Sequence, residues 1–262
     1  MQPADHDALT AALVEWAERA DGVLGLVLLG STAGTAHRAD DWSDHDFFVI
    51  AEADAAPRLR ASTAWLPVPP ARIVLHERDT EHGAWVVTDD GHLLEYAVFT
   101  PEELAESRSD AHRVAVDRLG DLPERIRPTL VPPSRDPGTV ATALLRALLV
   151  GGGRAARGER LVARRHLLEA AGGVLVLARL LEPAVSPVAD AQDPWRRAER
   201  THPALAAELD AILARSDARA AGDLAALAER VAGASPWWPA ALSAAVRRRL
   251  TAARGPERSA RA

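Results

Sequence analysis

The first 130 residues alternate between short apolar runs and polar stretches, a pattern that predicts a sheet with flanking helices. Leu9, Leu13 and Trp16 recur at helical spacing within residues 8–20 and indicate an amphipathic first helix. An Asp-Asp-Gly sequence separates two of the apolar runs and is typical of a tight hairpin turn, because it tolerates positive φ angles. We expect strands at 25–30, 46–50, 71–76, 84–88 and 92–99.

The chain changes character after a Pro-rich stretch at residues 124–138, which we interpret as a linker. Beyond it the apolar residues follow helical spacing only, and they predict a bundle of four to six helices. The end of the chain is rich in Arg, and we expect the tail after about residue 250 to be disordered. The predicted fold class is therefore α+β: a mixed-sheet domain at residues 1–130, followed by an all-α helical bundle domain at residues 131–262. The helices predicted for the bundle cover 139–150, 159–181, 203–214 and 222–232.

The two parts of the chain carry opposite net charge. All 31 basic residues are Arg, and the formal net charge of the whole chain is −6. Residues 1–130 hold 24 acidic and 11 Arg residues, whereas residues 131–262 hold 13 acidic and 20 Arg residues. An acidic part and an Arg-rich part could cooperate on a ligand that combines a metal with phosphates, although two solvated faces would give the same charges.

Composition excludes several kinds of chemistry. The chain has no Cys, which removes disulfides, thiol nucleophiles and Cys-ligated zinc. The N-terminal residues lack the pattern of a signal peptide, and the longest apolar run, residues 170–178, is too short to span a bilayer. Net acidity and the lack of an interleaved basic and aromatic pattern argue against nucleic-acid binding. We therefore expect a cytoplasmic protein without a membrane partner, and nucleic acid is a disfavoured partner, although the positive charge of the second half leaves tRNA open.

The most specific chemistry lies in residues 25–50. A predicted strand ends at Gly30-Ser31, a polar stretch follows, and the next strand begins with Asp44-His45-Asp46. Residues i and i+2 of a strand point to the same side, so Asp44 and Asp46 would project two carboxylates in parallel. Oxygen ligands of this kind suit Mg²⁺. The absence of a side chain at Gly30 would let backbone N–H groups and the Ser31 hydroxyl approach a phosphate.

A third carboxylate is available on a later strand. Glu95 interrupts the apolar run at residues 92–99, where a buried charge would be costly without a partner. Near a metal and a bound hydroxyl it could act as a general base, whereas on an edge strand it would simply face water. Asp89 and Asp90 are the competing candidates, but their position before Gly91 assigns them to the turn.

This arrangement of strand, Gly-Ser turn, spacer and Asp-x-Asp resembles the active-site signature of the DNA polymerase beta superfamily of nucleotidyltransferases. Within that superfamily it is most similar to a lincosamide nucleotidyltransferase, and less so to the aminoglycoside adenylyltransferases. The similarity extends to a helix pair joined by Arg157-Gly158-Glu159 in the second half. The chain departs from the lincosamide enzyme at Asp46, where that enzyme has Glu.

The resemblance implies transfer of a nucleoside monophosphate from a nucleoside triphosphate, first of all ATP, to a hydroxyl of a small molecule such as a lincosamide or aminoglycoside antibiotic. It assigns Mg²⁺ to Asp44, Asp46 and Glu95, and all three count as catalytic residues, with Glu95 a further ligand or the base. It assigns the nucleotide to Gly30 and Ser31, and it allows a homodimer. Among the arginines of the helical half, we predict that Arg157, Arg164 and Arg165 contact the phosphates.

Two alternatives stay open at this stage. The same chemistry could act on a protein or a tRNA, as in toxin-like members of the superfamily. The chain could also be an inactive nucleotide-binding or scaffold protein, against which the complete set of Asp44, Asp46 and Glu95 argues.

Overall fold

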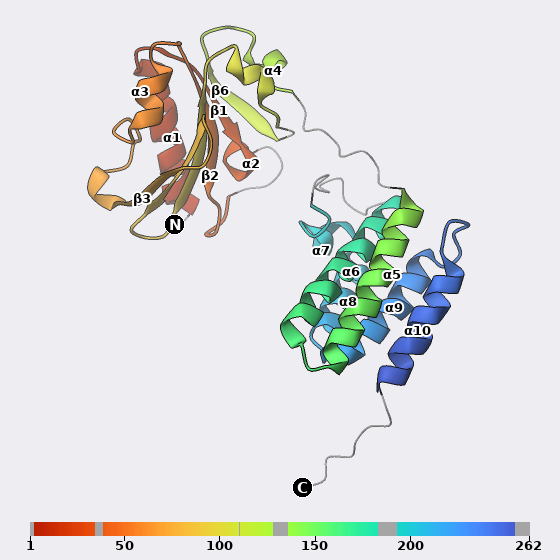
Figure 1. Cartoon of the computed structure of the whole chain (residues 1–262). Coiled ribbons are helices and arrows are strands. Elements are labelled where there is room, and N and C mark those ends of the chain that lie inside the picture. Colours follow the sequence, from red (N-terminus) through yellow and green to blue (C-terminus); the bar gives the residue numbers. More distant parts are fainter. Residues whose placement is uncertain (1–2, 35–38, 110, 128–135, 183–192, 255–262) are drawn as a thin grey trace. The chain divides into compact units, whose positions relative to one another are not determined.

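The computed structural model describes residues 3–34, 39–109, 111–127, 136–182 and 193–254. It divides into two compact units, Met1–Leu130 and Val131–Ala262, each of which is described by itself (Figure 1). The first unit is built on a mixed sheet and the second is helical, as the sequence pattern predicts.

The first unit contains a six-stranded sheet with the order β3-β4-β5-β2-β1-β6. Only the central pair, β2 and β5, is parallel, and all other neighbours run antiparallel. The predicted hairpin is confirmed: β4 and β5 pair across the turn, and Gly91 has a φ of +80°. The strands are β1 (Val23–Leu29), β2 (His45–Ala51), β3 (Ile73–Arg78), β4 (Gly83–Thr88), β5 (Leu93–Phe99) and β6 (His112–Asp117).

The two faces of this sheet have different roles. One face packs against helices α1 and α3, with Leu13 and Leu59 buried against strand residues such as Phe47 (Figure 1). The other face holds a smaller apolar cluster around Val27 and Leu122, and it also carries Asp46 and Glu95. The helices of this unit are α1 (Pro3–Arg19), α2 (Gly30–Ala33), α3 (Ala56–Ala61), η1 (Pro70–Arg72), η2 (Glu103–Glu106) and α4 (Leu122–Arg125).

Strand β6 is an addition to the prediction. It pairs with the far side of β1, so that β1 is an inner strand rather than an edge. Among its residues only Val116 is buried. A short edge strand of this kind gives a weak periodic signal.

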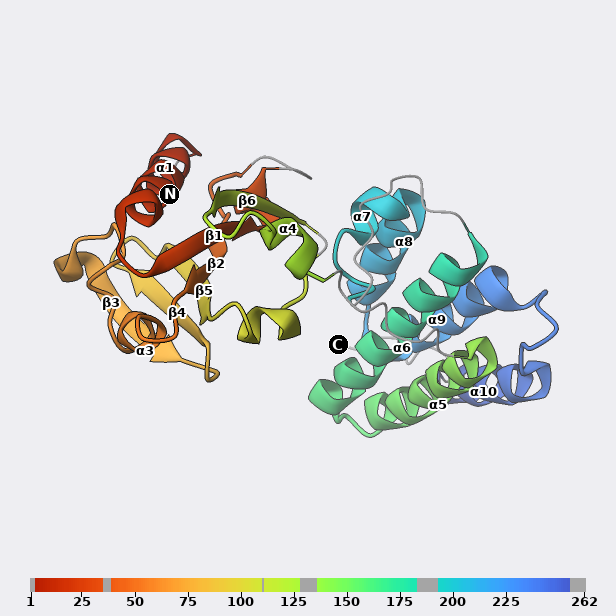
Figure 2. The ribbon, with the colours of Figure 1, turned by 90° about the horizontal axis from the view of Figure 1, so that it is seen from above.

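The second unit is a helical bundle with one apolar core. Helices α5 and α6 lie side by side, α9 packs against both, and α10 packs against α5 and α9 (Figure 2). Leu144, Leu148 and Val174 are among the fully buried side chains that hold α5 to α6. The helices are α5 (Pro137–Ala156), α6 (Arg160–Leu181), α7 (Ala198–Thr201), α8 (Pro203–Leu213), α9 (Asp217–Ala232) and α10 (Ala240–Arg254).

The end of helix α10 lies close to the expected start of the tail. Helix α10 continues to Arg254, beyond the predicted boundary at about residue 250. The reason is that Val246 and Leu250, four residues apart on one helix face, are buried in the bundle core. Residues 255–262 lie outside the described part of the chain.

Candidate metal centre

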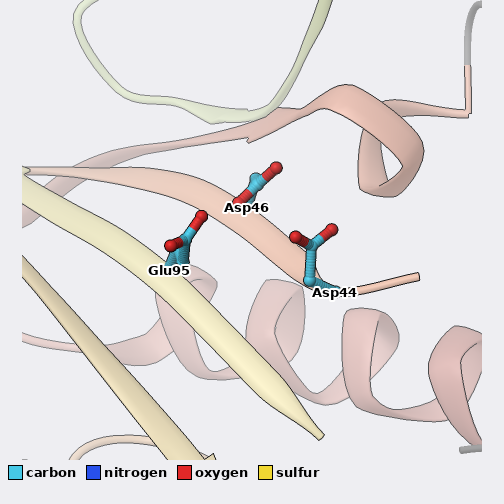
Figure 3. Close-up of side chains that lie close together, drawn as sticks. All are labelled: Asp44, Asp46 and Glu95. Atoms are coloured by element: carbon cyan, nitrogen blue, oxygen red, sulfur yellow. The ribbon is translucent and has the colours of Figure 1, made fainter. Parts of the chain in front are cut away.

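Three carboxylates converge on the polar part of the sheet. Asp44 directly precedes β2, Asp46 is its second residue, and Glu95 lies beside Asp46 on the parallel neighbour β5. One oxygen from each side chain lies within 4.8 Å of the others (Figure 3). Asp44 and Asp46 are half-buried and Glu95 is exposed. The i and i+2 spacing and the register of β2 with β5 therefore place three negative charges on one face, and among the described residues this is the group that could hold a metal ion.

The Gly30-Ser31 turn lies next to this group. Gly30 begins α2 directly after β1, and its φ of +50° favours a residue without a side chain. A Cβ atom at Gly30 would lie 3.3 Å from Asp46 Oδ2. Glycine at this position thus brings the α2 backbone close to the Asp46 carboxylate, and Ser31 follows on the same turn, partly exposed.

Asp89 and Asp90 lie apart from the centre. They form the β4–β5 turn, and Arg72 pairs with both, at 2.8 Å to Asp89 Oδ1 and 3.0 Å to Asp90 Oδ2. A hydrogen bond from the Thr88 hydroxyl, helped by Arg72, lowers the pKa of Asp90 to about 2. These contacts account for both carboxylates as parts of the turn.

A pocket of about 250 Å³ adjoins the triad and is lined by residues of β1, β2, β4 and β5 and of the segment that follows β3. Trp85 lies opposite Glu95 in the antiparallel pair, so Asp46, Glu95 and Trp85 form one row across three strands. Among the described residues that line the pocket there are three carboxylates and no Arg, which gives it a negative potential. The lining also contains Leu29, Phe47, Phe48, Asp79, Thr80, Gly83, Ala84, Tyr96 and Ala97.

Sequence reasoning did not single out Trp85 or Asp79. Trp85 lies in β4 and Asp79 directly follows β3, so their place beside the carboxylates depends on how β3, β4 and β5 pair. The hairpin signal at Asp89-Asp90-Gly91 was present in the sequence and predicts that β4 pairs with β5, but it does not determine the register of the pair. A two-residue Asp-Gly turn would have placed Trp85 opposite Tyr96, whereas in the structure Trp85 lies opposite Glu95.

A buried histidine layer lies on the opposite face of β2. His45, between the two aspartates, is fully buried. Its Nδ1 atom forms a hydrogen bond of 2.7 Å with Nε2 of His92. Burial, followed by the charges that His6 and His92 would carry, lowers the pKa of His45 to about 3. The His45 ring is therefore neutral around neutral pH, and its hydrogen bonds are those of a neutral imidazole.

The three predicted arginines all lie in the helical unit. Arg157 is the exposed residue that ends α5. Arg164 pairs with the buried Asp217 at 3.1 Å, and Arg165 pairs with Glu169 at 3.5 Å. Contact of these arginines with a phosphate stays a prediction.

Within the described ranges, no helix combines the length and the apolar character that crossing a membrane requires.

Comparison with known proteins gives similarity in structure only. No family model matches the chain, and no curated protein matches its sequence. The structure is similar to an aminoglycoside 6-adenyltransferase from Bacillus subtilis, with 11% identity, a TM-score of 0.42, and coverage of 96% of this chain and 99% of that chain. It is also similar to a nucleotidyltransferase-like protein from Exiguobacterium sibiricum, with 14% identity, a TM-score of 0.30, and coverage of 86% of this chain and 74% of that chain.

Proposed function

We propose that this chain transfers a nucleoside monophosphate from a nucleoside triphosphate to a hydroxyl group of a small molecule, with Mg²⁺ as cofactor. The observation that carries the proposal is the convergence of Asp44, Asp46 and Glu95 beside the Gly30-Ser31 turn. Like charges this close favour a cation, and a donor set made only of carboxylate oxygens fits Mg²⁺. Bound there, Mg²⁺ would neutralise charge on the phosphates and on the attacking oxygen.

Each residue of the metal centre has a separate role in the proposed reaction. Asp44 and Asp46 hold the metal, and Ser31 contacts the triphosphate, with Gly30 leaving room for the approach. The acceptor oxygen forms a bond to the α-phosphorus while the bond from that phosphorus to the bridging oxygen breaks, and pyrophosphate leaves. Glu95, which is exposed on the pocket side, takes the proton of the attacking hydroxyl or serves as a further metal ligand.

The pocket supports a cationic acceptor. The triphosphate side of the centre is the β1 side, where Gly30 and Ser31 lie, because β1 and β5 flank β2 on opposite edges. The acceptor would then occupy the part of the pocket that β4 and β5 line, with Trp85 as an apolar wall and Asp79 and Glu95 as anions. Carboxylates select amines, and aromatic faces favour both sugar rings and cations. Hydroxylated amines such as aminoglycosides and lincosamides combine these features.

A transfer assay tests the proposal. The purified chain is incubated with Mg²⁺, each of the four α-labelled ribonucleoside triphosphates, and a panel of aminoglycosides and lincosamides. We expect one compound to gain the mass of a nucleoside monophosphate, with ATP the first donor to examine. Asp46→Asn should abolish the product, whereas Glu18→Gln, which removes an exposed carboxylate on α1, should not. Label on protein or tRNA would move the acceptor to another class, and no transfer from any donor to any acceptor would overturn the proposal.

A further inference from the structure

Two buried side chains from outside β2 hold the backbone of Asp44. His6, on helix α1, lies with its Nε2 atom 3.0 Å from the Asp44 carbonyl oxygen. The Thr32 hydroxyl, on α2, donates to the same oxygen at 3.3 Å. His6 is 2% exposed and Thr32 is 4% exposed, so neither bond competes with bulk water.

Thr32 connects the two aspartates. Its hydroxyl oxygen also accepts the backbone N–H of Asp46 at 3.3 Å. One hydroxyl therefore bridges the carbonyl of Asp44 and the amide of Asp46, across the residue that separates them. Because Thr32 directly follows Gly30-Ser31, the same contact ties that turn to the strand that carries the carboxylates.

The His6 ring is fixed by its surroundings. It stacks on the His45 ring with 3.8 Å between ring centroids. The His45 Nε2 atom lies 3.2 Å from the His6 carbonyl oxygen and 3.1 Å from the Thr10 hydroxyl, while Nδ1 meets His92. His45 is thus held at both ring nitrogens, and its ring packs against the His6 ring.

The protonated nitrogen of His6 follows from these contacts. A carbonyl oxygen only accepts hydrogen bonds, so Nε2 must carry the hydrogen. The Nδ1 atom is buried and has no hydrogen-bond partner among the described residues. An unsatisfied buried nitrogen is costly, and an apolar side chain would fill the same space without that cost. What the imidazole adds, compared with an apolar residue, is its single hydrogen bond to Asp44.

We infer that His6 and Thr32 are positioning residues of the metal centre: they fix the backbone of Asp44 and Asp46 so that both carboxylates point at one ion. This inference rests on the proposed function, because it concerns a metal bound at the same carboxylates. Neither residue contacts the ion. Residues that orient metal ligands in this way commonly change metal affinity or activity by about 10- to 100-fold when they are replaced.

Matched variants at Thr32 test the inference. Thr32→Val keeps the branched shape and removes the hydroxyl, whereas Thr32→Ser keeps the hydroxyl. The dissociation constant for Mn²⁺ is measured by electron paramagnetic resonance on the full chain without nucleotide, well below the melting temperature of each variant. We expect Thr32→Val to weaken Mn²⁺ binding about 10-fold or more and Thr32→Ser to stay near the wild-type value. Equal Mn²⁺ affinity of Thr32→Val and wild type would overturn the inference.

A second pair covers the case in which Thr32→Val does not fold. His6→Gln offers an amide N–H in place of Nε2–H, and His6→Leu offers none. We expect His6→Leu to lose Mn²⁺ affinity, and His6→Gln to recover most of it. Loss of the same size in both His6 variants would assign the residue to packing alone and overturn the inference for it.

Asp46→Asn separates this inference from the proposed function. If wild type and Asp46→Asn bind Mn²⁺ equally weakly, the proposed function itself fails and takes the inference with it. If Asp46→Asn loses binding while Thr32→Val and His6→Leu do not, the metal centre stands and only the positioning role is refuted. In the transfer assay, the positioning role also requires a lower kcat with little change in the acceptor KM.

Discussion

Removal of one carboxylate from the triad should stabilise the metal-free protein. Glu95→Gln removes two repulsive pairs, those with Asp44 and Asp46, each at 4.8 Å or less. At the dielectric constant of water, which suits an exposed side chain, each pair costs about 0.9 kcal/mol. Screening at 0.15 M salt reduces that by roughly half, so the two pairs together cost about 1 kcal/mol. A gain of about 1 kcal/mol corresponds to a rise in melting temperature of roughly 4 °C for a unit of this size.

The assay is thermal unfolding followed by circular dichroism in EDTA, at two salt concentrations. Glu95→Gln should melt above wild type, and the difference should grow as the salt concentration falls. Glu18→Gln is the matched control: it removes an exposed carboxylate on α1, away from the triad, and should change stability by no more than about 0.5 kcal/mol.

Mg²⁺ should reduce the difference in melting temperature between Glu95→Gln and wild type. At ten times its dissociation constant, a ligand stabilises the folded state by about 1.4 kcal/mol. Wild type, with all three carboxylates, should gain more from Mg²⁺ than Glu95→Gln does. A Glu95→Gln protein that melts below wild type in EDTA would show that the carboxylates do not repel one another, and would refute the electrostatic reasoning.

Three further predictions concern the pocket, the sheet and the bundle. Asp79→Asn should raise the KM for a cationic acceptor about 2- to 5-fold with little change in kcat, as expected for loss of one exposed ion pair; steady-state kinetics checks this, and an unchanged KM contradicts it. Burial raises the pKa of Tyr96 to about 12. The unfolded chain therefore loses its phenol proton from about pH 10, while the folded chain keeps it up to about pH 12. About 3 kcal/mol of stability should be lost between pH 10 and 12 in EDTA. Tyr96 is the single Tyr of the chain, and Tyr96→Phe should flatten this alkaline loss in urea unfolding curves. In helix α5, a Cβ at Gly153 would have no atom near it, and Gly153→Ala should stabilise the protein by up to about 1 kcal/mol. A Cβ at Gly152 would lie 2.2 Å from Leu250 Cδ2, so the Gly152→Ala protein should melt below wild type.

Local periodicity was sufficient to predict the elements that carry the centre. The apolar runs around Val27 and Val49 mark the two strands, and the i and i+2 spacing of Asp44 and Asp46 sets their common face. That Glu95 joins them follows from the parallel pairing of β2 with β5, which no local pattern states. The resemblance to nucleotidyltransferases supplied that step in the sequence analysis.

The features that the sequence did not reveal depend on contacts between distant segments. Strand β6 is stabilised by pairing with β1, about 90 residues earlier in the chain, and its own residues alternate too weakly to predict it. The Arg-rich end of α10 has the composition of a solvated tail, yet Leu250 packs in the bundle core. The contacts of His6 and Thr32 with Asp44 span 38 and 12 residues, and only the tertiary structure brings them together.

The most direct test of the account is to locate the metal. Diffraction data collected at the manganese absorption edge, from crystals grown with Mn²⁺ and a non-hydrolysable nucleoside triphosphate analogue, would show each ion as an anomalous peak. We predict a peak within coordination distance of Asp44 and Asp46, with the triphosphate against Gly30 and Ser31. A nucleotide bound elsewhere, or Mn²⁺ coordinated away from these carboxylates, would contradict the account.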